Sequence, residues 1–166
     1  MNKPLKRSPH LIQLSKEHHH TLLFCWKIRQ GLKRKVDPKR IVPYVEYFWK
    51  THLRSHFAGE NLFFQKCTDP MVTRAYKEHE SIKVAVQQLE KVQVAELSQA
   101  LGEIADLVDQ HIRFEERILF PLLEQAIPAS TLGQVAAALA SIKDVPIVDL
   151  YADEFWLPIQ NASDDH

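Results

Sequence analysis

The sequence has few of the residues that mark specialised protein classes. Among 166 residues there are two cysteines and four glycines. Two cysteines without a C-x-x-C spacing form neither a disulfide framework nor a zinc-finger motif. Lys plus Arg and Asp plus Glu are both 21, so the net charge is zero. A neutral chain lacks the field that attracts nucleic acid, which argues against a nucleic-acid partner.

Long hydrophobic runs are missing as well. No window approaches the run of about 18 apolar residues that a membrane span needs. The N-terminal stretch MNKPLKRSPHLIQLSKEHHH lacks the apolar region and cleavage site of a secretory signal. We therefore expect a cytoplasmic protein without a membrane partner, with one domain, as the length suggests.

The apolar residues that are present recur at the three-and-four spacing of helices. Three helix starts carry a capping side chain before a proline suited to the first helical position: Ser8-Pro9, Asp37-Pro38 and Asp69-Pro70. Helices are expected over residues 9–33, 38–66, 70–92 and 95–126. Pro121 removes one helical hydrogen bond, so a bend is expected near the end of the last helix. The sequence predicts an all-α, up-down-up-down antiparallel four-helix bundle.

Two further segments follow the four long helices. The Ala-rich stretch STLGQVAAALASI after Pro128 predicts a short fifth helix that caps the bundle. The last residues contain two prolines and the aromatic pair Phe155 and Trp156, which predicts an irregular C-terminal tail. We expect it to lie against the bundle or a partner chain, which leaves a homodimer open. The expected division is residues 1–143 for the bundle and 144–166 for the tail.

Two stretches, HFAGENLFF and HIRFEERILFP, place a histidine one turn before a glutamate on an apolar helix face. At about 100° per residue, His56 and Glu60 lie on the inward stripe of one helix, and His111 and Glu115 on that of another. The first stripe is Val42, Val45, Trp49, Leu53, His56, Glu60 and Phe63, and the second runs from Leu97 through Val108, His111 and Glu115 to Leu122. An unpaired buried carboxylate costs several kcal/mol. A compensating cation is therefore expected.

The two remaining helices each contain a Lys-Glu-His triplet, in KEHHH and KEHES. His18 and His79 lie on their inward faces. His18 is favoured over His19, which is turned about 100° around the helix. His52, one turn before His56, is left open as a partner of a ligand or an alternative ligand. The expected metal ligands are His18, His56, Glu60, His79, His111 and Glu115.

Four imidazoles and two carboxylates suit iron, manganese or zinc. Two ions bridged by both glutamates fit this count, because each ion takes two imidazoles and one oxygen from each glutamate. An oxo or hydroxo bridge would leave roughly one open position per ion in an octahedral shell, where O₂, NO or peroxide binds. Metal-bound imidazoles normally donate their other N–H to an acceptor, for which Glu17, Glu78 and Glu116 are nearby candidates, but a surface salt bridge is the favoured role of each. The pattern does not tell which residues would be catalytic, and it points to no cofactor besides the metal.

These motifs resemble those of the hemerythrin-like family, also called HHE cation-binding domains, over residues 9–126. The resemblance is carried by EHHHTL, HFAGENLFF, KEHESI and HIRFEERILFP. It implies a four-helix bundle around a non-haem, carboxylate-bridged di-iron centre, with the four histidines as terminal ligands and Glu60 and Glu115 as bridges. Oxygen carriers of the family have one more histidine four residues before the position of His79, where this chain has Ala75. The set here is more similar to di-iron proteins linked to iron-sulfur cluster repair.

Three function hypotheses follow. The first is a di-iron protein that binds or reacts with O₂, NO or peroxide in sensing, iron handling or stress defence. The second is a redox enzyme or an iron donor for cluster repair. The third is an interaction module in which the metal, zinc for example, stabilises the bundle and the aromatic tail binds a partner.

Overall fold

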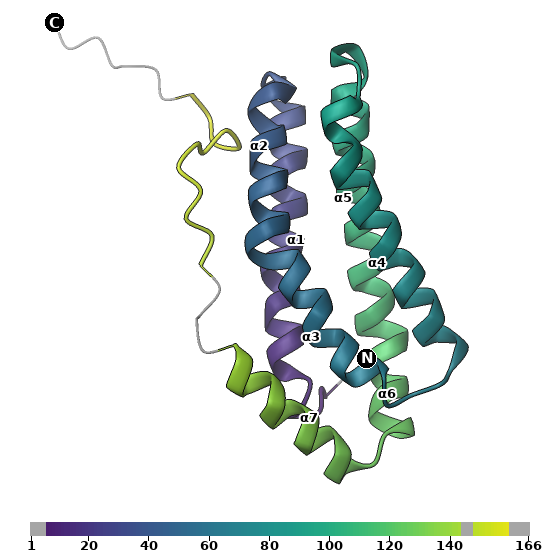
Figure 1. Ribbon diagram of the computed structural model, residues 1–166. Coiled ribbons are helices and arrows are strands. Elements are labelled where there is room, and N and C mark those ends of the chain that lie inside the picture. Colours follow the sequence, from purple (N-terminus) through teal and green to yellow (C-terminus); the bar gives the residue numbers. More distant parts are fainter. Residues whose placement is uncertain (1–5, 144–147, 160–166) are drawn as a thin grey trace, which may run out of the picture.

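The computed structural model describes residues 6–143 and 148–159. Regular structure in these two ranges is entirely helical, which confirms the all-α prediction (Figure 1). The α-helices are α1 (Ile12–Lys33), α2 (Pro38–Phe48), α3 (Arg54–Phe64), α4 (Pro70–Gln88), α5 (Leu97–Phe114), α6 (Phe120–Ala126) and α7 (Ala129–Ile142). The π-helical segments are η1 (Trp49–Leu53) and η4 (Glu115–Leu119), and the 3₁₀ segments are η2 (Leu89–Lys91) and η3 (Val94–Glu96).

Two of the three predicted helix starts act as expected. The side chains of Asp37 and Asp69 accept hydrogen bonds from the backbone N–H groups of Lys39 and Met71, with a proline at the first helical position. The first helix begins later than predicted, at Ile12, because residues 9–11 form a turn. The side chain of Ser8 caps this turn rather than the helix, by accepting a hydrogen bond from the N–H of His10.

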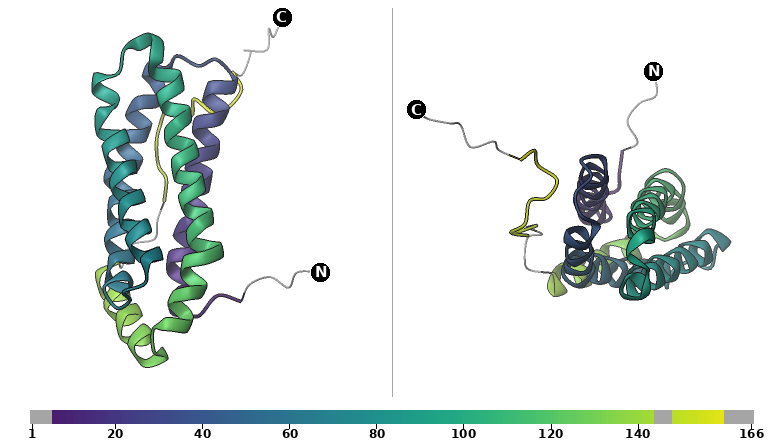
Figure 2. Two further views of the ribbon diagram at one scale, coloured as in Figure 1. Left: turned by 90° about the vertical axis from the view of Figure 1, so that its right-hand side faces the viewer. Right: turned by 90° about the horizontal axis from the view of Figure 1, so that it is seen from above.

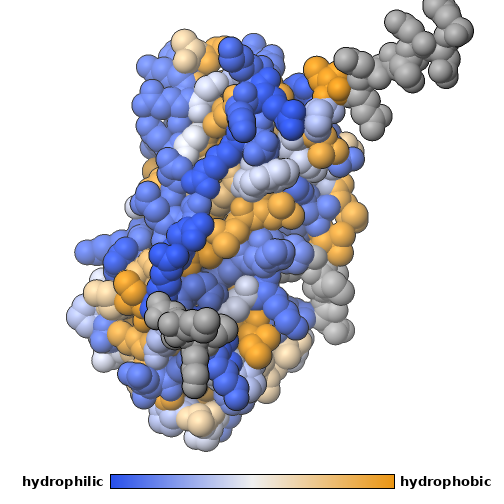
Figure 3. All heavy atoms as spheres, turned by 180° about the vertical axis from the view of Figure 1, so that it is seen from behind, coloured by the Kyte–Doolittle hydropathy of each residue, from blue (hydrophilic) through white to orange (hydrophobic). Residues whose placement is uncertain are grey.

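Four long rods form the up-down-up-down bundle: α1, α2 with η1 and α3, α4, and α5 with η4 and α6 (Figures 1 and 2). Helix α1 packs along α5, and α7 crosses the end of the bundle against α3. The face seen from behind is mostly hydrophilic, with hydrophobic residues in separate patches (Figure 3). Within the described ranges, every helix is too short or too polar to span a bilayer.

The π-helical segments interrupt the second and fourth rods and shift their buried stripes. A π turn adds a residue to the helical repeat, so a wheel drawn at a constant angle fails beyond it. Phe48, directly before η1, is buried, whereas Trp49, the predicted core residue at the start of η1, is only half-buried. After η4, Leu123 is buried and the predicted Leu122 is half-buried. The second interruption ends just before Pro121, which has no N–H to donate within the helix.

Residues 148–159 pack against the bundle. Phe155 and Trp156 are 2% and 7% exposed and belong to the core that includes Tyr44. Asp149 forms an ion pair with Lys27 at 2.7 Å and accepts a hydrogen bond from the hydroxyl of Tyr44, also at 2.7 Å. The aromatic pair is therefore covered by this chain's own helices, which disfavours the hypothesis that it binds a partner. The division of the chain at residue 143 stays a prediction.

We expect Phe155→Ala to lower the free energy of unfolding of the metal-free protein by about 3 kcal/mol, because it removes a buried ring. The ring lies against Gly31, where an added Cβ would come within 2.7 Å of it. Urea unfolding measures the change. Ile159→Ala is the matched control, since Ile159 is 91% exposed and its loss should change stability by less than about 0.5 kcal/mol. Equal stability of the two variants would contradict the tight packing.

Candidate metal centre

A polar layer divides the core of the bundle in two. One apolar cluster contains Phe24, Phe57, Ile82 and Val108, and the other contains Leu14, Phe63, Val72 and Phe114. On each rod the predicted ligands lie between residues of the first cluster and residues of the second. The six side chains therefore meet at one level of the bundle, with dry packing on both sides.

All six predicted ligand residues are buried. Glu60 and Glu115 are 0% exposed, and the most exposed of the six is His79, at 8%. They form two groups that share both carboxylates: His18 and His56 with Glu60 and Glu115, and His79 and His111 with the same two glutamates. Within each group, the potential ligand atoms lie within 4.8 Å of one another.

Each carboxylate divides its oxygens between the two groups. Glu60 Oε1 lies 3.1 Å from His18 Nε2 and 2.7 Å from His56 Nε2, whereas its Oε2 lies 3.0 Å from His79 Nε2. Glu115 Oε2 lies 3.1 Å from His18 Nε2, and its Oε1 lies 2.9 Å from His111 Nε2 and 3.4 Å from His79 Nε2. The arrangement has the form of two bridging carboxylates between two imidazole pairs.

Several of these atoms lack a hydrogen bond despite their short separations. Nε2 of His56, His79 and His111, Oε2 of Glu60 and both carboxylate oxygens of Glu115 are buried without a hydrogen-bond partner in the described part of the chain. Buried polar atoms are normally hydrogen-bonded, and an orphan of this kind costs about 1–3 kcal/mol. Lone pairs that converge without proper hydrogen-bond directions fit a cation between them.

The electrostatics of the layer balance imidazole against carboxylate. Burial alone would raise the pKa of Glu115, as would the charge of Glu60, yet His111 and His18 lower it to about 2. Burial likewise opposes charge on His111, but Glu115 and then Glu78 raise its pKa to about 10. The pKa of Glu60 is held well below its usual range despite burial, chiefly by His56. Without a metal, the histidine protons thus compensate the two buried carboxylates.

Carboxylates hydrogen-bond to the Nδ1 side of two imidazoles, and a third carboxylate lies within ion-pair distance of another. Glu116 Oε1 lies 2.6 Å from His18 Nδ1, Glu17 Oε2 lies 3.0 Å from His56 Nδ1, and Glu78 Oε2 lies 3.5 Å from His111 Nδ1. A carboxylate accepting from Nδ1–H leaves Nε2 free to bind a metal and fixes the ring plane. The expectation of surface salt bridges is therefore wrong for Glu17 and Glu116, which hydrogen-bond to His56 and His18, whereas Glu78 does form a salt bridge with Arg74.

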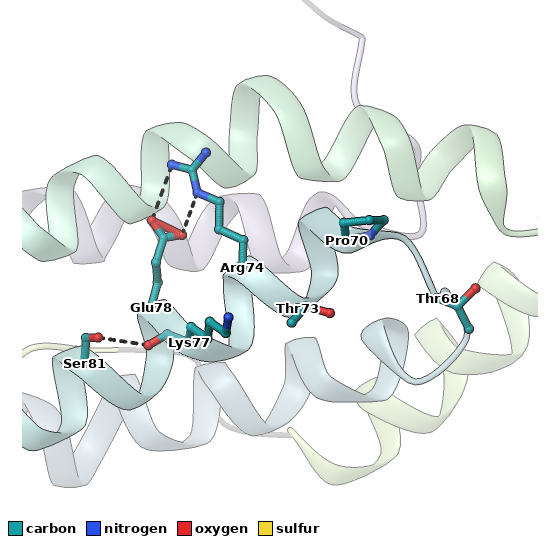
Figure 4. Close-up of a pocket in the computed structure, with 7 residues that line it drawn as sticks. All are labelled: Thr68, Pro70, Thr73, Arg74, Lys77, Glu78 and Ser81. Carbon is teal, nitrogen blue, oxygen red and sulfur yellow. Dashed lines mark hydrogen bonds and ion pairs between the residues drawn. The ribbon is translucent and has the colours of Figure 1, made fainter.

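Glu78 lies between the buried ring of His111 and a charged residue at the surface. It also faces Arg74 on the same helix, with a shortest ion-pair distance of 3.4 Å between Arg74 Nε and Glu78 Oε2 (Figure 4). Glu17, by contrast, is 5% exposed and points into the protein. The sequence did not distinguish the two, because both precede a histidine in a Lys-Glu-His triplet.

Comparison with known proteins decides the family. The family model described as the hemerythrin HHE cation binding domain matches residues 10–123 and, in an overlapping match, 78–140. The chain belongs to this family. A search of curated proteins and a search of solved structures gave no match. Family membership and the two His/Glu groups together indicate metal binding.

The other candidate positions lie outside the polar layer of this hemerythrin HHE domain. His19 is exposed, and His52 packs edge-on against Phe48, with ring centroids 4.7 Å apart, and belongs to neither ligand group. Ala75 is completely buried in apolar surroundings, so its position supplies no further nitrogen.

Phenylalanines that the sequence analysis did not single out pack on the imidazoles of this HHE domain. The ring of Phe57 stacks on His79, with centroids 3.8 Å apart and 12° between planes, and Phe120 stacks on His18 at 5.1 Å and 17°. They restrict the rotation of the rings and exclude water. The position of Phe57, next to His56, was visible in the motif, whereas that of Phe120 depends on the shift caused by η4.

Proposed function

We propose that this hemerythrin HHE domain holds two iron ions and binds or reacts with O₂, NO or peroxide. One ion would be held by His18 and His56, the other by His79 and His111, with Glu60 and Glu115 bridging. The observation that supports this most directly is the division of carboxylate oxygens between the two imidazole pairs. The donor set of nitrogen and oxygen suits iron, and manganese or zinc are possible substitutes.

Iron in such a site supplies open coordination positions and a change of oxidation state to a small ligand. The chain's own residues set the conditions for that chemistry. Glu17 and Glu116 hold the planes of two imidazoles by hydrogen bonds, and the negative charge of these carboxylates and of Glu78 strengthens the imidazoles as metal ligands. Phe57 and Phe120 limit access of water to the buried layer. A small, weakly polar ligand is favoured because the layer lies between two apolar clusters.

The proposal is tested by purifying the protein without a metal-affinity tag, loading it with iron and measuring the number of metal ions bound per chain. We expect about two irons per chain and a visible absorption that changes when the reduced protein meets O₂, NO or peroxide. A stable adduct would support binding, and repeated turnover of peroxide would make the protein a redox enzyme. Substoichiometric iron with no spectral response to any of the three would overturn the proposal. The cytoplasmic location and the open question of a homodimer remain at the level of prediction.

A further inference from the structure

A lysine outside the four long rods reaches toward the proposed metal centre. Lys143 directly follows α7, and its Nζ lies 2.6 Å from Glu17 Oε1. The other oxygen of Glu17 lies 3.0 Å from His56 Nδ1, which donates the hydrogen bond. A continuous chain of contacts therefore connects the end of α7 with the imidazole of His56.

The approach of α7 depends on a glycine in α3. A Cβ added at Gly59 would lie 2.9 Å from Leu139 Cδ1 and 3.3 Å from Lys143 Nζ. A glycine within a helix costs about 1 kcal/mol relative to alanine, so its place in α3 calls for a packing reason. The close contact with Leu139 and Lys143 supplies one.

Glu17 has space on the side away from His56. Glu17 and Lys143 both line a pocket of about 1120 Å³ between α1, α3, α7 and the tail. The side chains of Glu17 and Lys143 are 6% and 14% exposed. Without the ammonium group, the carboxylate would have room to turn into this pocket and leave His56 Nδ1. The ion pair with Lys143 thus keeps the Glu17 carboxylate in the position where its Oε2 accepts the hydrogen bond from His56 Nδ1.

We propose that Lys143 is a positioning residue that acts through Glu17 to fix the ring of His56 in the metal centre. The inference rests on the proposed function for its consequence, because a fixed ring matters most when His56 binds a metal. The positioning itself is a property of the metal-free chain. It can therefore be measured separately from metal loading.

The first test is NMR of metal-free protein labelled with ¹⁵N in histidine, comparing Lys143→Met with the wild type. We expect the Nδ1–H signal of His56, assigned by its absence in His56→Gln, to lose its hydrogen-bonded shift. Lys143→Arg should restore it, because the guanidinium keeps the charge. Lys16→Met is the matched control: Lys16 is exposed and lines the same pocket, so its loss should leave the signal unchanged.

The second test is the rate at which iron-loaded protein loses metal to a chelator. Loss of a residue that orients a metal ligand weakens metal binding by about 10–100-fold. Lys143→Met should therefore speed iron release by about tenfold, whereas Lys16→Met should leave the release rate unchanged. If Lys143→Met matches the wild type in both measurements, the positioning role is overturned. If the wild type binds no metal, the proposed function fails, and the NMR comparison still decides the role of Lys143.

Discussion

In the proposed di-iron centre, Glu60→Gln and Glu115→Gln are each expected to remove both irons rather than one. Each glutamate gives one oxygen to the His18 and His56 pair and the other to the His79 and His111 pair. A neutral amide has nearly the same shape, but it lacks the charge that a bridging ligand supplies. Loss of a residue that hydrogen-bonds to a metal ligand weakens metal binding by about 10–100-fold. Loss of a bridging ligand itself should therefore weaken binding by more than about 100-fold. Metal counting after gel filtration measures the result.

Two matched control variants separate the loss of a bridging carboxylate from the loss of a negative charge elsewhere in the protein. Glu78→Gln removes a carboxylate that pairs with Arg74 and, within the polar layer, approaches only Nδ1 of His111, so it should reduce affinity but keep iron at high metal concentration. Glu80→Gln removes a 64% exposed carboxylate paired with Lys83, and should change nothing. Circular dichroism confirms that each variant is folded. Retention of one iron by both bridge variants would show that the carboxylates are not shared, and retention of two would refute their role as ligands.

The bundle and the level of its polar layer could be predicted because both depend on local periodicity. Asp37 and Asp69 mark helix starts by a capping interaction within one turn. His56 and Glu60, like His111 and Glu115, are one turn apart, so their common face follows from helix geometry alone. The structure brings them together with His18 and His79, whose burial also followed from apolar neighbours on the same helix.

The register beyond the π-helical segments could not be predicted from a regular wheel. A single added residue moves the buried stripe from Trp49 to Phe48 and from Leu122 to Leu123. No residue type marks a π turn reliably, although Pro121 does mark a break in hydrogen bonding after the second.

Contacts between distant segments were likewise beyond the sequence. Lys143 meets Glu17 across 126 positions, and Arg7 meets Glu116 across 109. The helical periodicity of the sequence does not indicate which distant carboxylate a lysine or an arginine will contact. The sequence therefore favoured a surface salt bridge for Glu17 and for Glu116. The packed structure shows that each carboxylate instead contacts Nδ1 of a buried imidazole.

Metal uptake at pH 7.5 is expected to release protons, because a metal must displace the protons on Nε2 of the histidines. In the metal-free protein the pKa of His111 is raised to about 10, and those of His18, His56 and His79 are also raised. The ring of His111 therefore stays protonated at a pH where free imidazole is mostly neutral, and the neighbouring carboxylates favour the protonated form of the other three rings. Calorimetry in buffers of different ionisation enthalpy counts the released protons, and His111→Gln should lower the count by about one.

The same protons make the stability of the metal-free and the iron-loaded protein depend on pH in different ranges and with opposite sign. The folded pKa of His111 exceeds its unfolded value of 6.5, so its contribution to stability is complete below 6.5 and is lost as pH rises toward about 10. Glu115, lowered from 4.5 to about 2, contributes above 4.5 and loses that contribution as pH falls toward 2. The free energy of unfolding without metal should therefore decline from pH 6.5 to 10. With iron the histidines are already deprotonated in the folded state, so stability should increase as pH rises from about 5 to the unfolded pKa of 6.5, because only the unfolded chain then loses histidine protons; the slope is at most about 1.4 kcal/mol per pH unit for each histidine ligand, and stability should level off at higher pH. Urea unfolding across this range compares the two forms, and parallel pH profiles would show that the same imidazoles do not hold both protons and metal.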